Sequence, residues 1–315
     1  MSRGEVLEWI EGGQVAPERQ VAVLRAAGIL PTPADWRAFL SQLTLWLGTA
    51  ALAAAVIFFF AFNWDELGRI AKFALVEGAI VLVLVACWRI DLDGLAGKAV
   101  LVLLSLLTGA LLALTGQIYQ TGADTWELFA WWAVLIVPWV LVSRFTPLWL
   151  IWLVLLNAAA SLYFDDMLGG WAQMWTQLAI NSLALILWEA GHKAGLAWLR
   201  DSWPPRLVAI FSGYFATALV ISAIVDSANP QALPGALAYA AWLGAFYYWY
   251  RRVRPDAFML AGGVLSFIAA VTVFLSDLMI ESGNAGAFLL IGLVVIGMSA
   301  GGAMWLRSVV REARA

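Results

Sequence analysis

A few polar side chains in an apolar chain are the residues that could do chemistry, and Glu77 is the first of them. It is the only acidic residue in the middle of a long apolar segment. About ten residues into a helix that rises 1.5 Å per residue, it lies roughly 15 Å from either end. A carboxylate at that depth in a membrane must be protonated, paired or facing a wet cavity. Two interpretations stay open: a proton or cation relay or ligand contact, and a neutral or paired structural residue.

Two asparagines lie at a depth similar to that of Glu77, judged by residue counting. They are Asn157 and Asn181, each inside a later apolar segment. With Glu77 they could form one polar site at the middle of the membrane. They could equally be separate hydrogen bonds between helices, which commonly hold membrane bundles together.

The stretch 116–132, GQIYQTGADTWELFAWW, joins two apolar segments through a short turn crowded with polar and aromatic residues. Small residues on the preceding helix continue into Gln117, Tyr119 and Gln120, and then into Asp124 and Glu127. Buried amides need partners or water. The turn is therefore either a pocket that opens outward or a rigid, hydrogen-bonded helix hairpin. Asp124 and Glu127 also have the spacing of a capping box, which explains both acids without a ligand.

Nothing in the sequence requires catalysis. The only histidine, His192, lies beside Lys193 at the end of an apolar segment, and the only cysteine, Cys87, lies within one. The sequence has no nucleophile elbow, no zinc-protease pair and no phosphate loop. We therefore expect no catalytic residue, no metal site and no cofactor.

These residues must be positioned by a bundle of membrane helices, as the composition shows. Hydrophobic residues make up 63% of the 315 and charged residues only 12%, and the mean hydropathy is +0.86. A soluble domain is about half apolar and a quarter charged. The small net charge of −3, without a basic stripe, argues against nucleic-acid binding. The chain is predicted to be an all-helical, polytopic membrane protein.

Ten apolar runs have about the 20 residues that a membrane-spanning helix needs. Capped helix starts are predicted by two capping-box spacings, Asn63 with Glu66 and Asp124 with Glu127. Two pairs with proline also mark helix starts, Thr146-Pro147 and Arg254-Pro255. A kink is predicted at Pro138. The predicted spans are 39–62, 67–89, 95–119, 125–143, 146–164, 172–191, 205–226, 232–250, 256–280 and 284–307.

The basic residues predict the orientation of these spans, because Lys and Arg near span ends are retained in the cytoplasm. With both termini inside, 16 of the 18 basic residues face the cytoplasm and only Arg69 and Lys72 face outward. We expect the inner membrane of a bacterium, with residues 39–307 as the membrane domain. Residues 1–38 would form a cytoplasmic amphipathic helical segment, and 308–315 a short basic cytoplasmic tail.

Small residues recur four apart in two of the later runs. Ala236, Ala240 and Gly244 form one such face, and Gly297 and Gly301 form another. This spacing favours close helix packing and does not identify an oligomer interface.

The chain resembles a family of bacterial membrane proteins called domain of unknown function 2157. The resemblance rests on FAFNWDEL at 60–67, on 116–132 followed by Pro138-Trp139, and on the amphipathic segment before the first span. It implies an inner-membrane protein without an established activity, and a joint complex with membrane proteins bearing a Gly-Asp-Tyr motif. On that analogy Gly116, Gln117, Tyr119, Asp124 and Glu127 would be the functional or architectural centre.

Three functional hypotheses remain. The first is binding or transport of a small solute, ion or lipid through the outer turn and Glu77, which Glu77→Gln should abolish. The second is a scaffold subunit whose outer turns or N-terminal segment dock another membrane protein. The third, a membrane enzyme acting on lipid-linked substrates, would lose its activity in Asp124→Asn and Glu127→Gln. In each case the lipid bilayer is the surrounding partner.

Overall fold

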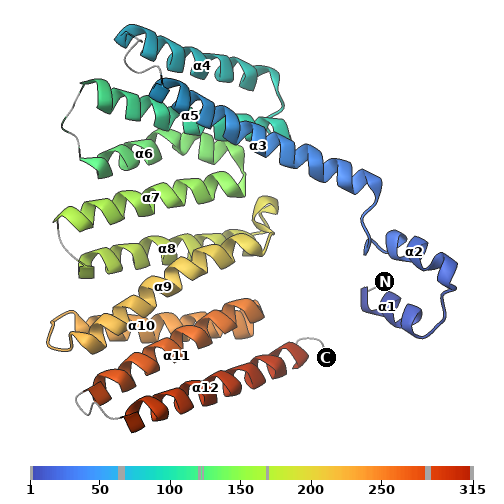
Figure 1. Cartoon of the computed structure of the whole chain (residues 1–315), viewed down its shortest axis with the longest axis vertical. Coiled ribbons are helices and arrows are strands. Elements are labelled where there is room, and N and C mark those ends of the chain that lie inside the picture. The colour runs from blue at the N-terminus through green and yellow to red at the C-terminus, as the bar shows by residue number, and fades with distance from the viewer. Residues whose placement is uncertain are drawn as a thin grey trace. The chain divides into compact units, whose positions relative to one another are not determined.

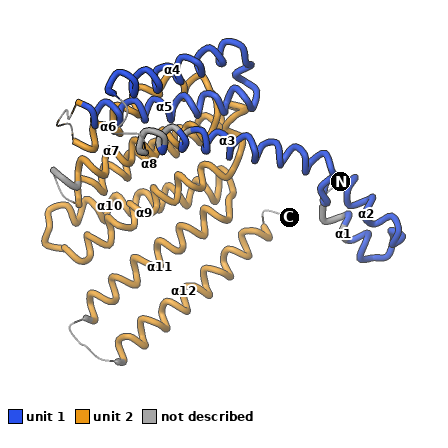
Figure 2. The backbone as a smooth tube through the Cα atoms, turned by 45° about the horizontal axis from the view of Figure 1, so that its top comes forward, with its two compact units in different colours: residues 1–118 blue, residues 119–315 orange. Residues whose placement is uncertain are grey.

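The computed structural model describes residues 3–62, 68–119, 122, 124–167, 170–280 and 285–312. All regular elements in these ranges are helices, so the all-helical prediction is confirmed. The chain divides into two compact units, Met1–Ile118 and Tyr119–Ala315 (Figure 2). The boundary falls inside the polar stretch 116–132, and each unit is described by itself.

The first unit begins with two short helices, α1 (Arg3–Glu11) and α2 (Pro17–Ala26), which contact each other. Three long helices follow: α3 (Pro33–Phe62), α4 (Arg69–Arg89) and α5 (Leu95–Tyr119). The predicted amphipathic helices before the first long helix are therefore present. The long helix itself starts at Pro33, six residues before the predicted span.

A capping box that the sequence analysis missed explains this early start. The Thr32 hydroxyl oxygen accepts the Asp35 N–H at 3.2 Å, and Asp35 Oδ2 accepts the Thr32 N–H at 2.7 Å. Hydrogen bonds from the Thr32 hydroxyl and N–H lower the pKa of Asp35. Pro33 then occupies the first helical position, where its missing N–H costs nothing.

The second unit is a stack of seven long helices, most of them packed against their sequence neighbours (Figure 1). Helix α9 is central, because it contacts α8, α10 and α11, whereas α12 packs on α11. The helices are α6 (Thr125–Ser143), α7 (Thr146–Met167), α8 (Gly170–Lys193), α9 (Trp203–Val225), α10 (Ala232–Tyr248), α11 (Ala257–Ile280) and α12 (Ala285–Glu312).

Hydroxyl groups tie α9 to its neighbours. Ser212 bonds to the Ser182 hydroxyl of α8 at 2.9 Å and accepts the Trp242 indole N–H of α10 at 2.8 Å. One turn along, Thr217 and Ser266 of α11 lie 2.7 Å apart. In an apolar surrounding such bonds satisfy the polar groups and fix the helix register.

Seven described helices are long and apolar enough to cross a membrane: α4, α5, α6, α7, α9, α11 and α12. They correspond to seven of the ten predicted spans. The other three predicted spans also form helices, α3, α8 and α10, but are not among the seven. Helix α10 has only 17 residues before its geometry changes, and α8 carries the buried polar residues Gln177, Asn181 and Glu189.

The predicted helix starts are correct in position at Asp124 and Thr146. Two details of the capping prediction are wrong. The Asp124 side chain makes no capping hydrogen bond. The residue that caps α11 is Asp256, whose Oδ1 accepts the Phe258 N–H at 2.9 Å, and not Arg254. The predicted box at Asn63 and Glu66 lies outside the described residues.

Candidate functional site

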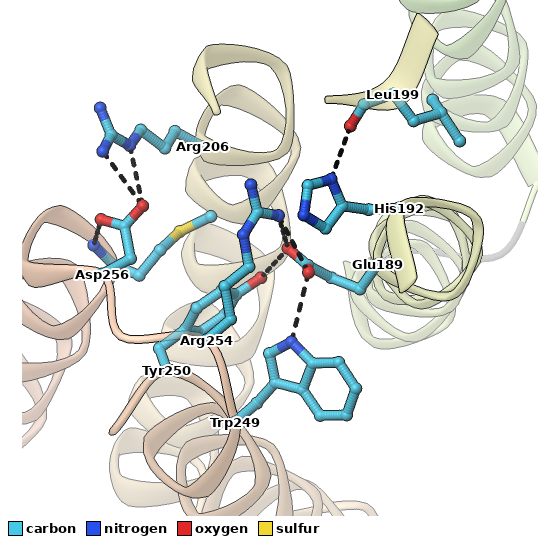
Figure 3. A network of polar contacts seen from close by, with 9 residues as sticks. Glu189, His192, Leu199, Arg206, Trp249, Tyr250, Arg254 and Asp256 are labelled. Atoms are coloured by element: carbon cyan, nitrogen blue, oxygen red, sulfur yellow. Dashed lines mark hydrogen bonds and ion pairs between the residues drawn. The ribbon is translucent and has the colours of Figure 1, made fainter. Parts of the chain in front are cut away.

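A buried carboxylate, Glu189, forms the most connected polar cluster that the described residues show (Figure 3). Its side chain is 6% exposed and comes from the last turns of α8. Oε1 accepts hydrogen bonds from Arg254 Nη1 at 2.9 Å and from the Tyr250 hydroxyl at 3.0 Å. Oε2 accepts from the same Arg254 nitrogen at 3.0 Å and from Trp249 Nε1 at 3.3 Å.

A π-helical turn over Trp249–Val253 positions these donors. The turn follows α10 directly, and the Arg254 N–H donates to the Trp249 carbonyl five residues back at 2.9 Å. A π turn is wider than an α turn and occurs frequently at functional sites. Here it brings Trp249, Tyr250 and Arg254 to one carboxylate.

Two further contacts surround the cluster. Arg206 of α9 donates from Nε and Nη2 to Asp256 Oδ2, each at 3.1 Å, so Asp256 both caps α11 and binds a cation. His192 Nδ1 lies 3.1 Å from the Leu199 carbonyl oxygen. Because a carbonyl only accepts, that nitrogen carries the proton, and His192 fastens the short 3₁₀ turn Ala197–Leu199 to α8.

This arrangement makes Glu189 a clamp between helices. Both carboxylate oxygens already accept two hydrogen bonds, and Arg254 balances the charge. The cluster therefore holds α8, the π turn and the start of α11 together. Sequence reasoning missed it because Glu189 lies near the end of an apolar run, close to Lys193, where an acidic residue is unremarkable.

The predicted asparagines do meet. Asn181 Nδ2 donates to Asn157 Oδ1 at 2.6 Å, and Asn157 Nδ2 returns a bond to Asn181 Oδ1 at 3.3 Å. Gln177 joins them by donating to the Asn157 carbonyl at 2.9 Å and to the Ser161 hydroxyl at 2.6 Å. Asn181 and Gln177 are almost fully buried. Of the two alternatives, this geometry is a hydrogen bond between α7 and α8, and Gln177 is an additional member.

The other predicted residues are distributed over the two units, so a joint site that includes Glu77 stays a prediction. Glu77 is exposed on α4, in the first unit, whereas the two asparagines belong to the second. In the polar turn, Gln117, Tyr119 and Asp124 are exposed and Glu127 is half-buried. Gln117 belongs to the first unit and the other three to the second. Gln120 lies outside the described residues, so the choice between pocket and hairpin stays a prediction.

A large groove of about 760 Å³ opens between α10, α11 and α12. Small residues from all three helices create it: Ala240, Gly244, Gly263, Gly301 and Gly302. No charged side chain is among its described lining residues, and the Tyr239 hydroxyl at its edge is bonded to Ser266 at 3.1 Å. Tyr247 and Trp305 close one end, with ring centroids 6.1 Å apart. Ala240 and Gly244 of one predicted small-residue face and Gly301 of the other thus line this groove, whereas Ala236 and Gly297 do not.

Comparison with known proteins supports the resemblance that the sequence indicates. Residues 7–149 match the model of a family described as predicted membrane proteins, domain of unknown function 2157. No curated protein and no solved structure matches the chain. The matched residues include the motifs at 60–67 and 116–132, whereas the Glu189 cluster and the large groove lie beyond them.

Proposed function

We propose that this chain is a polytopic inner-membrane protein that binds the hydrocarbon part of a lipid in the groove between α10, α11 and α12. The single observation that carries the proposal is the groove itself, about 760 Å³ in volume and lined by apolar and small side chains. Ligand pockets commonly have volumes of roughly 300 to 1,000 Å³ and mostly apolar walls. A lipid chain satisfies such walls, whereas an ion or a polar solute would lose its hydration without gaining partners.

The polar clusters of the second unit favour a lipid as the ligand over a polar solute or an ion. The Asn157–Asn181 pair and the Ser212 and Ser266 contacts are occupied by hydrogen bonds between helices. They act as packing contacts. A path for a polar solute would instead need polar groups that the solute can reach. We therefore place the ligand in the groove and not at the amide cluster.

The experiment uses two glycines that lie one turn apart on α12. A Cβ atom added at Gly301 or at Gly297 would meet no atom within 4 Å, but only Gly301 lines the groove. Native mass spectrometry of protein released gently from its membranes should show a retained lipid in the wild type and in Gly297→Leu. Gly301→Leu should lose it. Equal retention in the two variants would overturn the proposal.

Glu77 takes no part in this function. Glu77→Gln should leave lipid retention unchanged, since Glu77 is not among the residues that line the groove. Loss of the lipid in that variant would instead support the relay or ligand contact that its depth suggests.

The proposal includes ten membrane spans with both termini in the cytoplasm. The basic residues of the second unit support it. Arg206 and Arg254 lie near Glu189 (Figure 3), and Lys193 ends α8 and lines the same groove as Glu189. Cysteine labelling tests it in a Cys87→Ala background. A membrane-impermeant maleimide should label Ala228→Cys in the α9–α10 turn from outside, and should not label Asp93→Cys between α4 and α5.

A second candidate function, docking of another membrane protein, is favoured by the N-terminal helices. Trp9 of α1 and Val21 of α2 are 40% and 49% exposed, although both are large and apolar. Deleting residues 1–33 should release a partner subunit without changing lipid retention. Retention of all subunits after that deletion would exclude docking through this segment.

A further inference from the structure

A second groove, on the other side of α10, has a different chemistry. It lies between α8 and α10 and has a volume of about 320 Å³. Leu185 and Ile186 of α8 and Phe246 of α10 form its apolar walls. Glu189 and Trp249 line it near one end, and Lys193 lies at that end.

The length of this groove matches one leaflet of a membrane. Its α8 residues run from Ser182 to Lys193, twelve residues and eleven steps, which is about 16.5 Å at 1.5 Å per residue. Half of a hydrocarbon core that is about 30 Å thick is roughly 15 Å. A single acyl chain of one leaflet therefore fits along the groove, with its polar end at Lys193.

Among the described residues that line the groove, Lys193 carries the charge that no ion pair balances. Glu189, the acidic residue nearest in sequence, is bound to Arg254 at 2.9 Å, so its charge is already balanced. Lys193 is exposed and forms no ion pair within the part of the chain that the structure describes. A long lysine side chain at a helix end extends toward the headgroup region. A fitting ligand would therefore place an anion at the Lys193 ammonium and a hydrocarbon chain against the apolar walls of the groove.

We infer that the α8–α10 groove binds one anionic phospholipid, with its phosphate at the Lys193 ammonium and an acyl chain along Leu185 and Ile186. This site is separate from the α10–α12 groove, where no charged residue is available. The Glu189 clamp serves it by holding α8 and the π turn at a fixed spacing around the headgroup end.

The chain offers matched variants for both halves of the lipid. Lys193→Gln removes the cation, and Arg307→Gln removes an exposed cation of α12 that does not line the groove. Ile186→Trp fills the apolar part, whereas its neighbour Leu187, equally exposed at 62% against 63%, does not line the groove. Leu187→Trp is therefore the control for bulk.

The experiment is native mass spectrometry of delipidated protein titrated with phosphatidylglycerol or phosphatidylcholine. The wild type should prefer phosphatidylglycerol, and Lys193→Gln should lower that preference about fivefold, the effect of one basic residue near an anionic surface. Ile186→Trp should bind one lipid fewer, whichever of the two lipids is offered, while Arg307→Gln, Leu187→Trp and Gly301→Leu should leave the site unchanged. If Lys193→Gln behaved like Arg307→Gln, or Ile186→Trp like Leu187→Trp, the inference would be wrong. Equal competition by inorganic phosphate would also overturn it, because free phosphate would then be the ligand.

Discussion

The two grooves beside α10 differ in how their ends are built. The α10–α12 groove ends at the Tyr247 and Trp305 rings and has no charge among its described lining residues. The α8–α10 groove ends at Lys193, beside a carboxylate that Arg254 neutralises. The same helix thus borders a purely apolar site and an amphipathic one. Taken together, the two proposals imply that ligand class depends on a few terminal residues and not on the walls, which are mostly apolar in both grooves.

The largest expected effect comes from breaking the clamp that borders only one groove. Glu189→Gln leaves the guanidinium of Arg254 without its anion in a largely buried position. We expect it to lower the free energy of unfolding by about 3 kcal/mol, as for other buried pairs that lose one partner. Denaturant unfolding in detergent measures this loss. A wild-type midpoint in this variant would mean that the cluster does not hold α8 to the π turn.

The next prediction makes the apolar groove resemble the amphipathic one. Trp305→Lys places a cation at the end that two rings now close. The α10–α12 groove should then gain a preference for phosphatidylglycerol over phosphatidylcholine of about fivefold. Trp305→Leu is the control, because it opens the same end without a charge. If both variants bound the two lipids alike, the end residues would not decide ligand class.

A smaller effect is expected from the amide cluster, which lines neither groove. Asn181→Ala removes the reciprocal bonds to Asn157. A double-mutant cycle with Asn157→Ala should give a coupling of about 1 kcal/mol, within the range measured for hydrogen bonds between membrane helices. Lipid binding to both grooves should persist. Loss of binding would mean that the amides belong to a ligand site after all.

The smallest effect should come from Glu312→Gln. Its ion pair with Arg251 joins the end of α12 to the π turn, but the Glu312 side chain is 60% exposed. Exposed pairs contribute about 0 to 1 kcal/mol. The unfolding midpoint should therefore hardly move, in contrast to Glu189→Gln. A loss as large as that of Glu189→Gln would show that the α12 end is held as firmly as α8.

The helices could be predicted from the sequence, because an apolar run of span length has few alternatives to a helix. The sequence predicted for Asn157 and Asn181 either one polar site with Glu77 or separate hydrogen bonds between helices. It did not predict that the two asparagines bond to each other, since equal depth does not say which helices are neighbours. The Glu189 cluster could not be predicted. Its partners lie 60 to 65 residues later in the chain. They are brought together by a π turn over Trp249–Val253, and the sequence of this turn, WYRRV, has no periodicity that predicts it.

The two grooves also could not be predicted from the sequence, because they depend on how helices pack. The small faces at Ala240, Gly244 and Gly301 indicated close packing, yet in the structure these residues line open space between helices. Whether a small residue brings two helices together or leaves a hollow depends on how three helices cross. That arrangement is a property of the assembled bundle.

The separation of Glu189 from its partners also sets an order of events during synthesis. Arg254 follows Glu189 by 65 residues in the chain. At 5 to 20 residues per second, the ribosome needs about 3 to 13 seconds to make them. During that interval α8 carries a carboxylate without its cation. Because an unpaired charge is costly inside the membrane, this favours a nascent helix that stays near water or the insertion machinery. The clamp can form only after Arg254 has been synthesised, so the contact between α8 and the π turn is completed late.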